Sequence, residues 1–280
     1  MTRAVPMARS ALGGALATAG TGWVLRRRPP LGRQAWARTN HRGEPVTLLA
    51  GPAVAVGATV AAALTPGVPA RVRLAALVAG SASGALGAYD DLSGTGRDRG
   101  FHGHLGALRR GEISTGALKV MGIGAAGLVA GGLVRDGAVE RILAGGVVAG
   151  TANLVNLLDL RPGRALKAVA ALAATEIGAG SALPGIAPAL PSIAPALLGA
   201  AAAALPADLG ERAMLGDAGA NALGALVGLA AASRCSRRGL APRLCLLVTL
   251  TAASERVSFT AVIAATPGLR ELDALGRRRR

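Results

Sequence analysis

Charged, aromatic and cysteine residues are all scarce in this chain. Charged residues make up 16% and aromatic residues 2% of its 280 residues, whereas 51% are hydrophobic. A chain this poor in charge is too apolar for an ordinary soluble domain, and it is too long for a simple membrane anchor. The two cysteines, Cys235 and Cys245, show neither metal-ligand spacing nor a disulfide framework, and both are predicted to be structural.

Lysine and histidine are also rare, although the net charge is +16. Only Lys119 and Lys167 are lysines, so almost all of the positive charge is arginine. The arginines are spread over loops between apolar stretches and are not gathered on one soluble face, which argues against a nucleic-acid partner. His102 and His104 have no third histidine nearby, so a metal site there is disfavoured.

Apolar sequence is abundant, in stretches near the roughly 20 residues that cross a bilayer. Each stretch is predicted to be a helix, because unpaired backbone groups are intolerable in lipid. Glycine (41 residues) and alanine are plentiful, which favours close helix packing. The fold prediction is therefore an all-α, polytopic membrane bundle of nine to ten transmembrane helices, forming one domain over residues 1–280. Nine spans are placed at 7–25, 46–64, 71–89, 115–134, 141–159, 165–183, 188–205, 217–233 and 241–259.

The distribution of basic residues predicts the side that each loop faces. With the N-terminus outside, 20 of the 31 Lys and Arg residues fall in inner regions and 10 in outer ones, so the C-terminus is predicted to be cytoplasmic. A cleaved signal peptide is the alternative for the N-terminus, because residues 17–19 resemble a cleavage site. One predicted outer loop, 233–243, contains four arginines and does not follow this distribution, so we call it the dissenting outer loop. The predicted cytoplasmic, functional loops are 26–45, 90–114, 159–167, 206–217 and 254–280, and the arginines at 277–280 are expected to touch anionic headgroups.

A first polar cluster, Asp90 and Asp91, directly follows the third apolar stretch. Two adjacent carboxylates at a membrane boundary repel each other unless a cation or an arginine lies between them. A solvated helix end paired with Arg97 or Arg99 is the alternative interpretation. The glycine-rich run after the pair lacks the GK[ST] ending of a phosphate-binding loop.

A second cluster combines two amides with a carboxylate at the end of the fifth apolar stretch. At 100° per residue, Asn153, Asn156 and Asp159 lie within about a 120° sector, so they share one helix face. The alternative is that they are interhelical hydrogen-bonding residues. Asp159 favours a functional role, because a boundary carboxylate is costly to keep in a membrane.

A third cluster opens the eighth apolar stretch with Asp217, which follows Gly216 and precedes Asn221. A carboxylate at a helix start can cap the helix or hold a cation, and simple capping is the alternative here. The predicted topology brings all three clusters to the cytoplasmic face. Their carboxylates could therefore surround one Mg²⁺, which accepts one or two carboxylates and keeps room for phosphate. Lys119 and Lys167 lie beside these clusters, where an ammonium would suit a phosphate.

The order and wording of these motifs resemble those of the polyprenyl-phosphate N-acetylhexosamine-1-phosphate transferases. This superfamily includes phospho-MurNAc-pentapeptide translocase and the GlcNAc-1-phosphate transferases. The resemblance covers about residues 40–259, and it rests on "DD" at 90–91, "NLVNLLD" at 153–159 and "LGDAGAN" at 215–221. It implies a phosphoglycosyl transferase of cell-envelope glycan synthesis. Such an enzyme is multi-pass in the cell membrane and carries its active site on the cytoplasmic face.

The resemblance also implies the substrates and the residue roles. A Mg²⁺-dependent enzyme would transfer a sugar-1-phosphate from a nucleotide-sugar, such as a UDP-N-acetylhexosamine, to a membrane polyprenyl phosphate. We assign three roles: catalytic for Asp90, Asp91 and Lys119; metal binding for Asp217 and Asp90; and substrate binding for Asn153, Asn156, Asp159, Asn221 and Arg212. A homodimer is a further possible partner arrangement.

Three features depart from the family pattern. The run "LRPGRALK" after Asp159 replaces a frequent D-G-x-x-G pattern, and Met214 stands where some members carry an aromatic residue that stacks on uracil. The histidine-rich loop near the family's C-terminal end is missing, and Arg256 or Arg212 are the candidates to replace its phosphate contact.

Two other classes of function remain as alternatives. The first is a family-derived membrane protein that binds polyprenyl phosphate or scaffolds envelope proteins without catalysis. The second is a transporter in which Glu176, inside the sixth apolar stretch, acts as a coupling acid. The absence of acids elsewhere on the outer half of the predicted bundle argues against the transporter.

Overall fold

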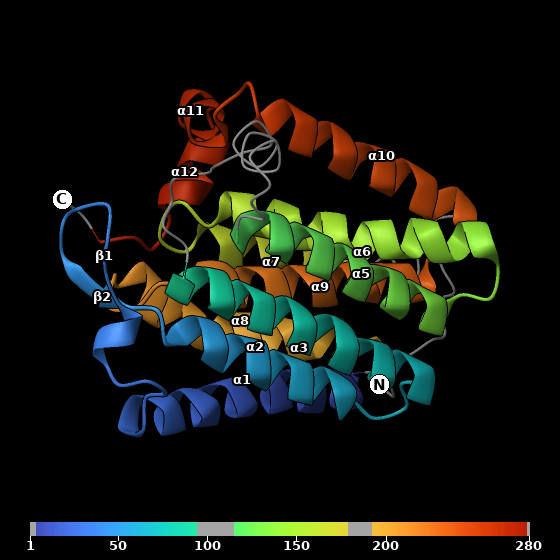
Figure 1. The fold of residues 1–280 in the computed structure, drawn as a ribbon, viewed down its shortest axis with the longest axis horizontal. Helices are drawn as coiled ribbons and strands as arrows, with labels where there is room; N and C mark the ends of the chain where they lie inside the picture. The colour runs from blue at the N-terminus through green and yellow to red at the C-terminus, as the bar shows by residue number, and fades with distance from the viewer. Residues whose placement is uncertain (1–3, 94–114, 179–191, 279–280) are drawn as a thin grey trace.

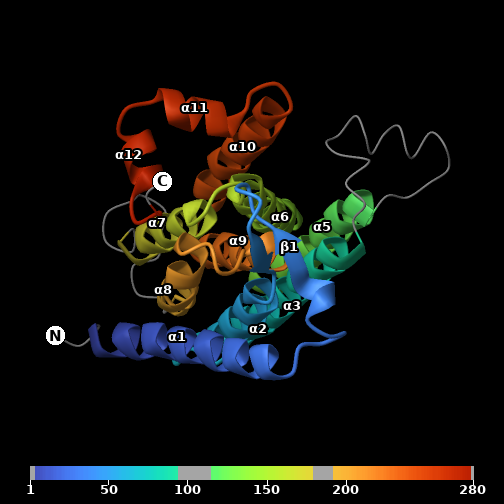
Figure 2. The ribbon, with the colours of Figure 1, turned by 90° about the vertical axis from the view of Figure 1, so that its left-hand side faces the viewer.

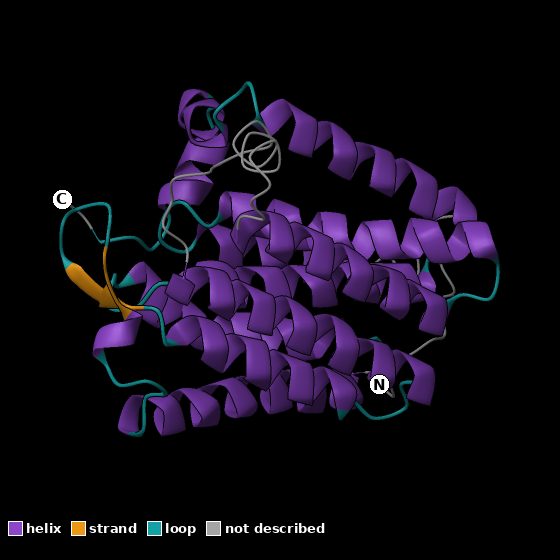
Figure 3. Cartoon of the chain, in the orientation of Figure 1, coloured by secondary structure: helices purple, strands orange, loops and turns teal. Residues whose placement is uncertain are grey.

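The computed structural model describes residues 4–93, 115–178 and 192–278, and it is mostly helical. Each of the nine predicted apolar stretches contains a helix among its described residues, so the all-α class is confirmed (Figure 1, Figure 3). These helices are α1 (Ala4–Arg27), α2 (Ala50–Ala63), α3 (Ala70–Ser93), α5 (Thr115–Val134), α6 (Ala138–Leu158), α7 (Arg164–Gly178), α8 (Ala194–Leu209), α9 (Gly216–Arg234) and α10 (Arg237–Ser254). Two short helices follow, α11 (Phe259–Ala265) and α12 (Leu269–Ala274).

The number of membrane spans differs from the prediction of nine to ten. Among the described residues, three helices are long and apolar enough to cross a membrane: α3, α5 and α6. A fourth candidate exists if α10 and α11, which are bent by 96° relative to each other, count as one broken span. The physical reason is length and polarity. Helices α2 and α8 have 14 and 16 residues, and at 1.5 Å per residue they fall short of a hydrocarbon core about 30 Å thick. Polar residues and glycines leave the long helices α1 and α9 insufficiently apolar.

Helix α9 forms the centre of the bundle (Figure 2). Almost every residue from Ala218 to Arg234 is buried, on all sides of the helix, and the helix packs against α2, α3, α6 and α7. A helix enclosed in this way must present small residues, so that neighbouring backbones can approach it. Helices α1 and α10 lie further out, with α1 against α2 and α8 and α10 mainly against α6.

Successive long helices reverse direction, so the bundle has two distinct ends (Figure 1). Helices α3 and α6 end, and α5, α7 and α9 begin, at what we call the site end. The turns α2–α3, α5–α6 and α9–α10 lie at the opposite end. The 19 residues of α9 separate the two ends by about 28 Å.

A small β-hairpin covers the site end, and it extends from the predicted loop 26–45 into the first residues of the predicted span 46–64. Strands β1 (Ala37–Thr39) and β2 (Pro45–Thr47) pair antiparallel, and the Thr47 carbonyl accepts the N–H of Met214 at 2.9 Å. An isolated two-stranded hairpin is marginal in water. This hairpin is held by a small core of Trp36, Leu48 and Leu49. The hairpin thus fixes the chain immediately before α9.

Candidate active site

Lys119 joins two of the predicted carboxylates at the site end. Its Nζ lies 2.7 Å from Asp90 Oδ2 and also forms an ion pair with Asp217 Oδ2. The three residues come from α5, α3 and α9, and their side chains are 12%, 16% and 28% exposed, respectively. Two carboxylates this sheltered repel each other unless a cation lies between them, and the ammonium of Lys119 meets that requirement. The structure thus brings Asp90, Asp217 and Lys119 together at one place.

Asp91 caps the N-terminus of α9 from another helix. The backbone N–H groups of Asp217 and Ala218 each donate to its carboxylate at 3.0 Å. The residue before α9, Leu215, provides no side-chain cap. Asp217 itself is therefore not the cap of its helix, which leaves its carboxylate free to meet Lys119. We call Asp90, Asp91, Asp217 and Lys119 the acid cluster.

Two glycines allow this close approach of α3 and α9. A Cβ atom at Gly87 would lie 2.5 Å from the carbonyl carbon of Asp217 and 2.7 Å from Cα of Ala218, so only glycine fits there. Gly216 has φ of 62°, a left-handed conformation that costs other residues about 1–2 kcal/mol. The backbone turns at Gly216 so that the first amides of α9 point toward Asp91.

Asp159 lies beside the acid cluster, at the C-terminal end of α6. Burial raises the pKa of Asp159 well above its ordinary value, and the negative charges of Asp208, Asp217 and Asp91 raise it further, against a hydrogen bond from the Gly216 backbone. The charge effects place Asp159 within electrostatic range of Asp217. The third predicted acidic motif thus converges with the other two.

A small polar pocket of about 70 Å³ opens next to Asp159. Acidic and basic side chains from the hairpin, from the turn after α6 and from the turn before α9 surround it. Its lining residues are Asn40, His41, Val46, Asp159, Leu160, Arg161, Pro162, Asp208, Glu211, Ala213 and Met214. No member of the acid cluster lines this pocket, and the pocket approaches the cluster only through Asp159.

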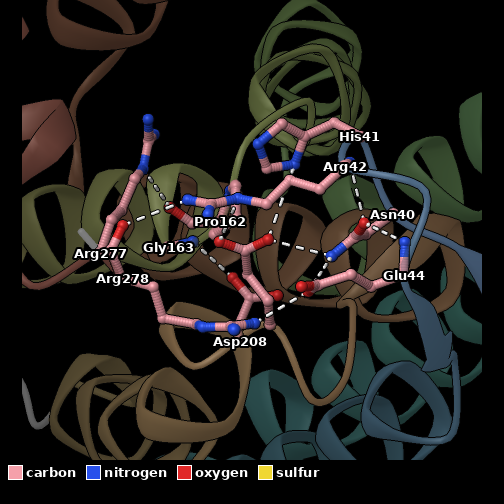
Figure 4. A network of polar contacts seen from close by, with 10 residues as sticks. Asn40, His41, Arg42, Glu44, Pro162, Gly163, Asp208, Arg277 and Arg278 are labelled. Atoms are coloured by element: carbon pink, nitrogen blue, oxygen red, sulfur yellow. Dashed lines mark hydrogen bonds and ion pairs between the residues drawn. The ribbon is translucent and has the colours of Figure 1, made fainter. Parts of the chain in front are cut away.

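One wall of this pocket is an ordered network of charged residues (Figure 4). Glu211 has φ of 53° and a side chain only 1% exposed, an unfavourable conformation for a residue with a side chain. Its carboxylate accepts from Asn40 Nδ2 at 2.9 Å and pairs with Arg42 Nε at 3.1 Å. Asp208 accepts the N–H of Gly163 at 2.5 Å. These contacts connect the hairpin to the turns on either side of it.

The C-terminal residues 269–278, which we call the strap, cross this end of the bundle. The Arg164 guanidinium holds Asp273 with two hydrogen bonds, at 2.8 and 3.0 Å. Lys167 Nζ donates to three backbone carbonyls in and after α12, at 2.6 to 2.9 Å. Lys167 therefore caps α12, and it does not extend the acid cluster as the placement of the two lysines suggested.

The strap also uses the arginines that were expected at lipid headgroups. Arg277 contacts Asp273 at 2.5 Å and the Pro162 carbonyl at 2.8 Å, and Arg278 pairs with Glu44 at 2.8 Å. Both arginines therefore have internal partners. Residues 279 and 280 lie outside the described residues.

Several predicted substrate-binding residues have other contacts. Asn153 donates to Thr251 of α10 at 3.0 Å, which is the interhelical alternative for this residue. Asn221 is buried and donates to the Asp217 carbonyl at 2.7 Å, within its own helix. The exposed side chain of Arg212 contacts the Pro206 carbonyl at 3.3 Å. Asn156 keeps a buried amide oxygen with no hydrogen-bond partner among the described residues, so it remains the amide with capacity for a ligand.

Some expectations fall outside the described residues. Arg97, Arg99, His102 and His104 all belong to residues 94–114, so their relation to the acid cluster is not described. Within residues 4–93, 115–178 and 192–278, no group of three or more His, Cys, Asp or Glu side chains is arranged to hold a metal ion. Asp90 and Asp217 provide two carboxylates that meet at one cation.

The pocket contains residues that sequence reasoning did not select: His41, Arg161, Asp208 and Glu211. A signal was present for the two acids, because Asp208 and Glu211 precede Asp217 in the same predicted loop. His41 and Arg161 reach the pocket through the hairpin and a turn, neither of which has a repeating pattern in the sequence. No protein-family model matches the chain, and no curated protein sequence matches it.

Proposed function

We propose that this protein transfers a sugar-1-phosphate from a nucleotide-sugar to a membrane polyprenyl phosphate. The observation that carries the proposal is the meeting of Asp90, Asp91, Asp217 and Lys119, from three helices, beside a polar pocket. The three aspartates belong to the motifs on which the family resemblance rests, and Lys119 lies outside those motifs. We further propose that the site end faces the cytoplasm in a multi-pass membrane protein, because the basic residues favour that side.

The proposed reaction exchanges one phosphoanhydride bond for another. A phosphate oxygen of the lipid forms a bond to the sugar-bearing phosphorus, and the bond from that phosphorus to the nucleoside monophosphate breaks. The lipid phosphate is already ionised at neutral pH, so the main tasks are positioning and charge neutralisation. The pocket beside Asp159 would hold one polar group of the donor, and the apolar helix surfaces would leave the acceptor chain in lipid.

The acid cluster offers distinct roles for its members. Lys119 would neutralise charge on the transferred phosphate. Asp91 would act as a positioning residue, because both of its oxygens already hold the first turn of α9. Asp217 and Asp90 would hold Mg²⁺, which takes one or two carboxylates from a protein and the remaining ligands from phosphate and water. When bound, the ion would supply positive charge to the diphosphate.

The donor site is expected to differ from that of the family. Met214 lines the pocket in place of the family's aromatic residue, and neither Arg212 nor Arg256 has a described contact with the acid cluster. Arg161 and His41 line the pocket and are the better candidates for a donor phosphate. We therefore expect a donor that is not held by stacking on an aromatic ring.

The test is incorporation of label into lipid by membranes that contain the full chain. The membranes are incubated with polyprenyl phosphate, Mg²⁺ and a panel of labelled nucleotide-sugars. We expect a lipid-linked product, and a loss on the order of 10³-fold for Asp217→Asn. Asp136→Asn, a change to an exposed acid at the opposite end, is the matched control and should leave the rate unchanged. Absence of product with every donor, or full activity of Asp217→Asn, would contradict the proposal.

One observation favours a non-catalytic alternative, in which the protein binds polyprenyl phosphate or scaffolds envelope proteins. Lys119 already pairs with both Asp90 and Asp217, so each of these carboxylates has a cationic partner among the described residues without a metal ion. The alternative predicts binding of polyprenyl phosphate without turnover. It also predicts that Asp217→Asn leaves that binding and the cellular phenotype unchanged.

A further inference from the structure

A second charged cluster lies at the opposite end of the bundle, about 26 Å along α9 from Asp217. Glu176 of α7 is 4% exposed, and Arg243 NH1 of α10 pairs with its Oε1 at 2.6 Å. Arg234, at the end of α9, donates to the backbone carbonyl of Glu176. Two of the four arginines in the dissenting outer loop are thus bound to a single acidic residue.

This cluster keeps unused charge and hydrogen-bonding capacity. Its two arginines and one glutamate leave an excess positive charge in a sheltered place, where an unbalanced charge is unfavourable. Glu176 Oε2 and Arg234 Nε are both buried without a hydrogen-bond partner among the described residues. Buried polar atoms nearly always have a partner, so these two atoms call for an explanation.

An apolar groove of about 240 Å³ leads away from the Glu176–Arg243 pair. Helices α6 and α9 form its floor through Val147 and Val227, and α7 and α10 form its walls through Leu172, Leu246 and Leu250. The groove exists because α10 packs mainly against α6 and leaves the side toward α7 open. Leu246 is exposed, as expected for a side chain that faces lipid.

We propose that this groove binds an anionic glycerophospholipid whose head group carries a hydroxyl. An acyl chain fills the apolar groove, the phosphate pairs with Arg243, and the head-group hydroxyl donates to the Glu176 carboxylate. An anion balances the excess arginine, and a hydroxyl gives Oε2 the donor that it lacks. The proposal concerns the opposite end of the molecule and does not depend on the transfer reaction proposed above.

The experiment measures lipid binding by the full chain purified in a neutral detergent, using native mass spectrometry and thermal stabilisation. Phosphatidylglycerol is the probe, phosphatidylcholine tests the charge, and water-soluble glycerol phosphate tests the head group alone. We expect wild-type protein to prefer phosphatidylglycerol to phosphatidylcholine at least tenfold, a difference of about 1.4 kcal/mol. Glycerol phosphate at the same concentration should not bind detectably.

Two pairs of variants test the two parts of the site. Arg243→Gln removes the cation, and Arg237→Gln on the same helix, exposed and outside the groove, is its control. Leu246→Trp obstructs the groove from an exposed position, and Val248→Trp, equally exposed and outside the groove, is its control. Arg243→Gln and Leu246→Trp should each abolish the preference, whereas both controls should keep it.

Three results would overturn the proposal. The first is equal binding of the two lipids by the wild-type protein. The second is an unchanged preference in the folded Leu246→Trp variant, which remains informative even if Arg243→Gln does not fold. The third is a change of oligomeric state in Leu246→Trp with unchanged lipid preference, which would make the groove an interface between two copies of this chain.

Discussion

The two ends of the bundle each hold a sheltered charged cluster, and the two clusters have net charges of opposite sign. At the site end, two carboxylates, Asp90 and Asp217, share the single ammonium of Lys119. At the opposite end, two guanidinium groups, Arg234 and Arg243, share the single residue Glu176. The first arrangement has a negative charge left over, and the second has a positive one.

The sign of the leftover charge indicates what each end can bind. A carboxylate pair with one cation suits a divalent ion together with a phosphate, and a surplus arginine beside an apolar groove suits an acidic lipid. The surroundings of the two clusters also differ in polarity. A pocket lined by polar side chains lies at the site end beside Asp159, whereas leucine side chains lie beside Glu176.

Lys119→Met should have the largest effect on stability. It leaves two sheltered carboxylates without a cation, which typically costs about 3–5 kcal/mol of unfolding free energy. Thermal unfolding in detergent, followed by circular dichroism, measures the loss. Lys167→Met removes the other lysine, which only caps a short helix, and should cost about 1 kcal/mol.

The stabilisation of the wild type and of Lys119→Met by Mg²⁺ tests whether Asp90 and Asp217 are metal ligands. If Asp90 and Asp217 form a metal site, removal of the competing ammonium should make Mg²⁺ stabilise Lys119→Met more than the wild type. Equal stabilisation of both proteins, or of neither, would contradict the assignment of Asp90 and Asp217 as ligands.

Gly87→Ala should come next in size, because the added methyl group collides with the backbone of Asp217 and Ala218. Overpacking of this kind costs about 1–3 kcal/mol, and it should also separate Asp91 from the first turn of α9. Gly124→Ala in α5 is the control, since a Cβ there meets open space. The control should match or slightly exceed wild-type stability, by at most about 1 kcal/mol, through its higher helix propensity.

The pH dependence of stability should differ in sign between two acids of the site end. Burial raises the pKa of Asp273, but hydrogen bonds and charges from Arg164 and Arg277 outweigh it, so the pKa is lowered overall. Its contribution to stability is therefore present above the unfolded pKa near 3.9 and lost as the pH falls through the folded value. Wild type and Asp273→Asn should differ in unfolding free energy at neutral pH and converge in acid.

Asp159 should behave in the opposite way, because its folded pKa is raised. Folding then takes up a proton, so stability declines as the pH rises from about 4 toward the folded pKa. Asp159→Asn should flatten that part of the profile in unfolding experiments from acidic to neutral pH. A profile identical to that of the wild type would show that the carboxyl is not sheltered as the structure indicates.

Asp136→Ala should have the smallest effect. Asp136 lies 3.7 Å from Arg71 in a pair that is exposed on both sides, and such pairs contribute less than about 0.5 kcal/mol. The same unfolding measurement should give a value within error of the wild type. A larger loss would contradict the expectation that an exposed ion pair at the opposite end contributes little to stability.

The sequence predicted the helices better than it predicted their relation to a membrane. All nine apolar stretches contain helices among their described residues, because a run of alanine, leucine and valine between glycine or proline turns favours that structure in almost any apolar setting. Their number as spans was wrong, because burial by other helices and burial by lipid favour the same composition. Helix α9 is the clearest example, since neighbouring helices enclose it on all sides.

The candidate site was predictable in its acids and not in its amides. Asp90, Asp91, Asp159 and Asp217 are costly residues in an apolar chain, and they do meet at one end. Asn153 shares a helix face with Asp159 but bonds to Thr251, because the position of α10 depends on packing that no local pattern records. The hairpin and the strap were missed for the same reason.

What the sequence determined by itself was an apolar helical chain with a few acids placed at helix ends, since charge is unfavourable in such a chain and is kept only where it has a partner. The tertiary structure alone decided which partner each acid has. Lys119 lies between Asp90 and Asp217, and Asp91 accepts the N–H of Asp217, which lies 126 residues later in the chain. The partner of each acid depends on how closely the helix backbones approach one another. Glycines such as Gly87 allow that close approach, but their effect appears only once the helices are packed together.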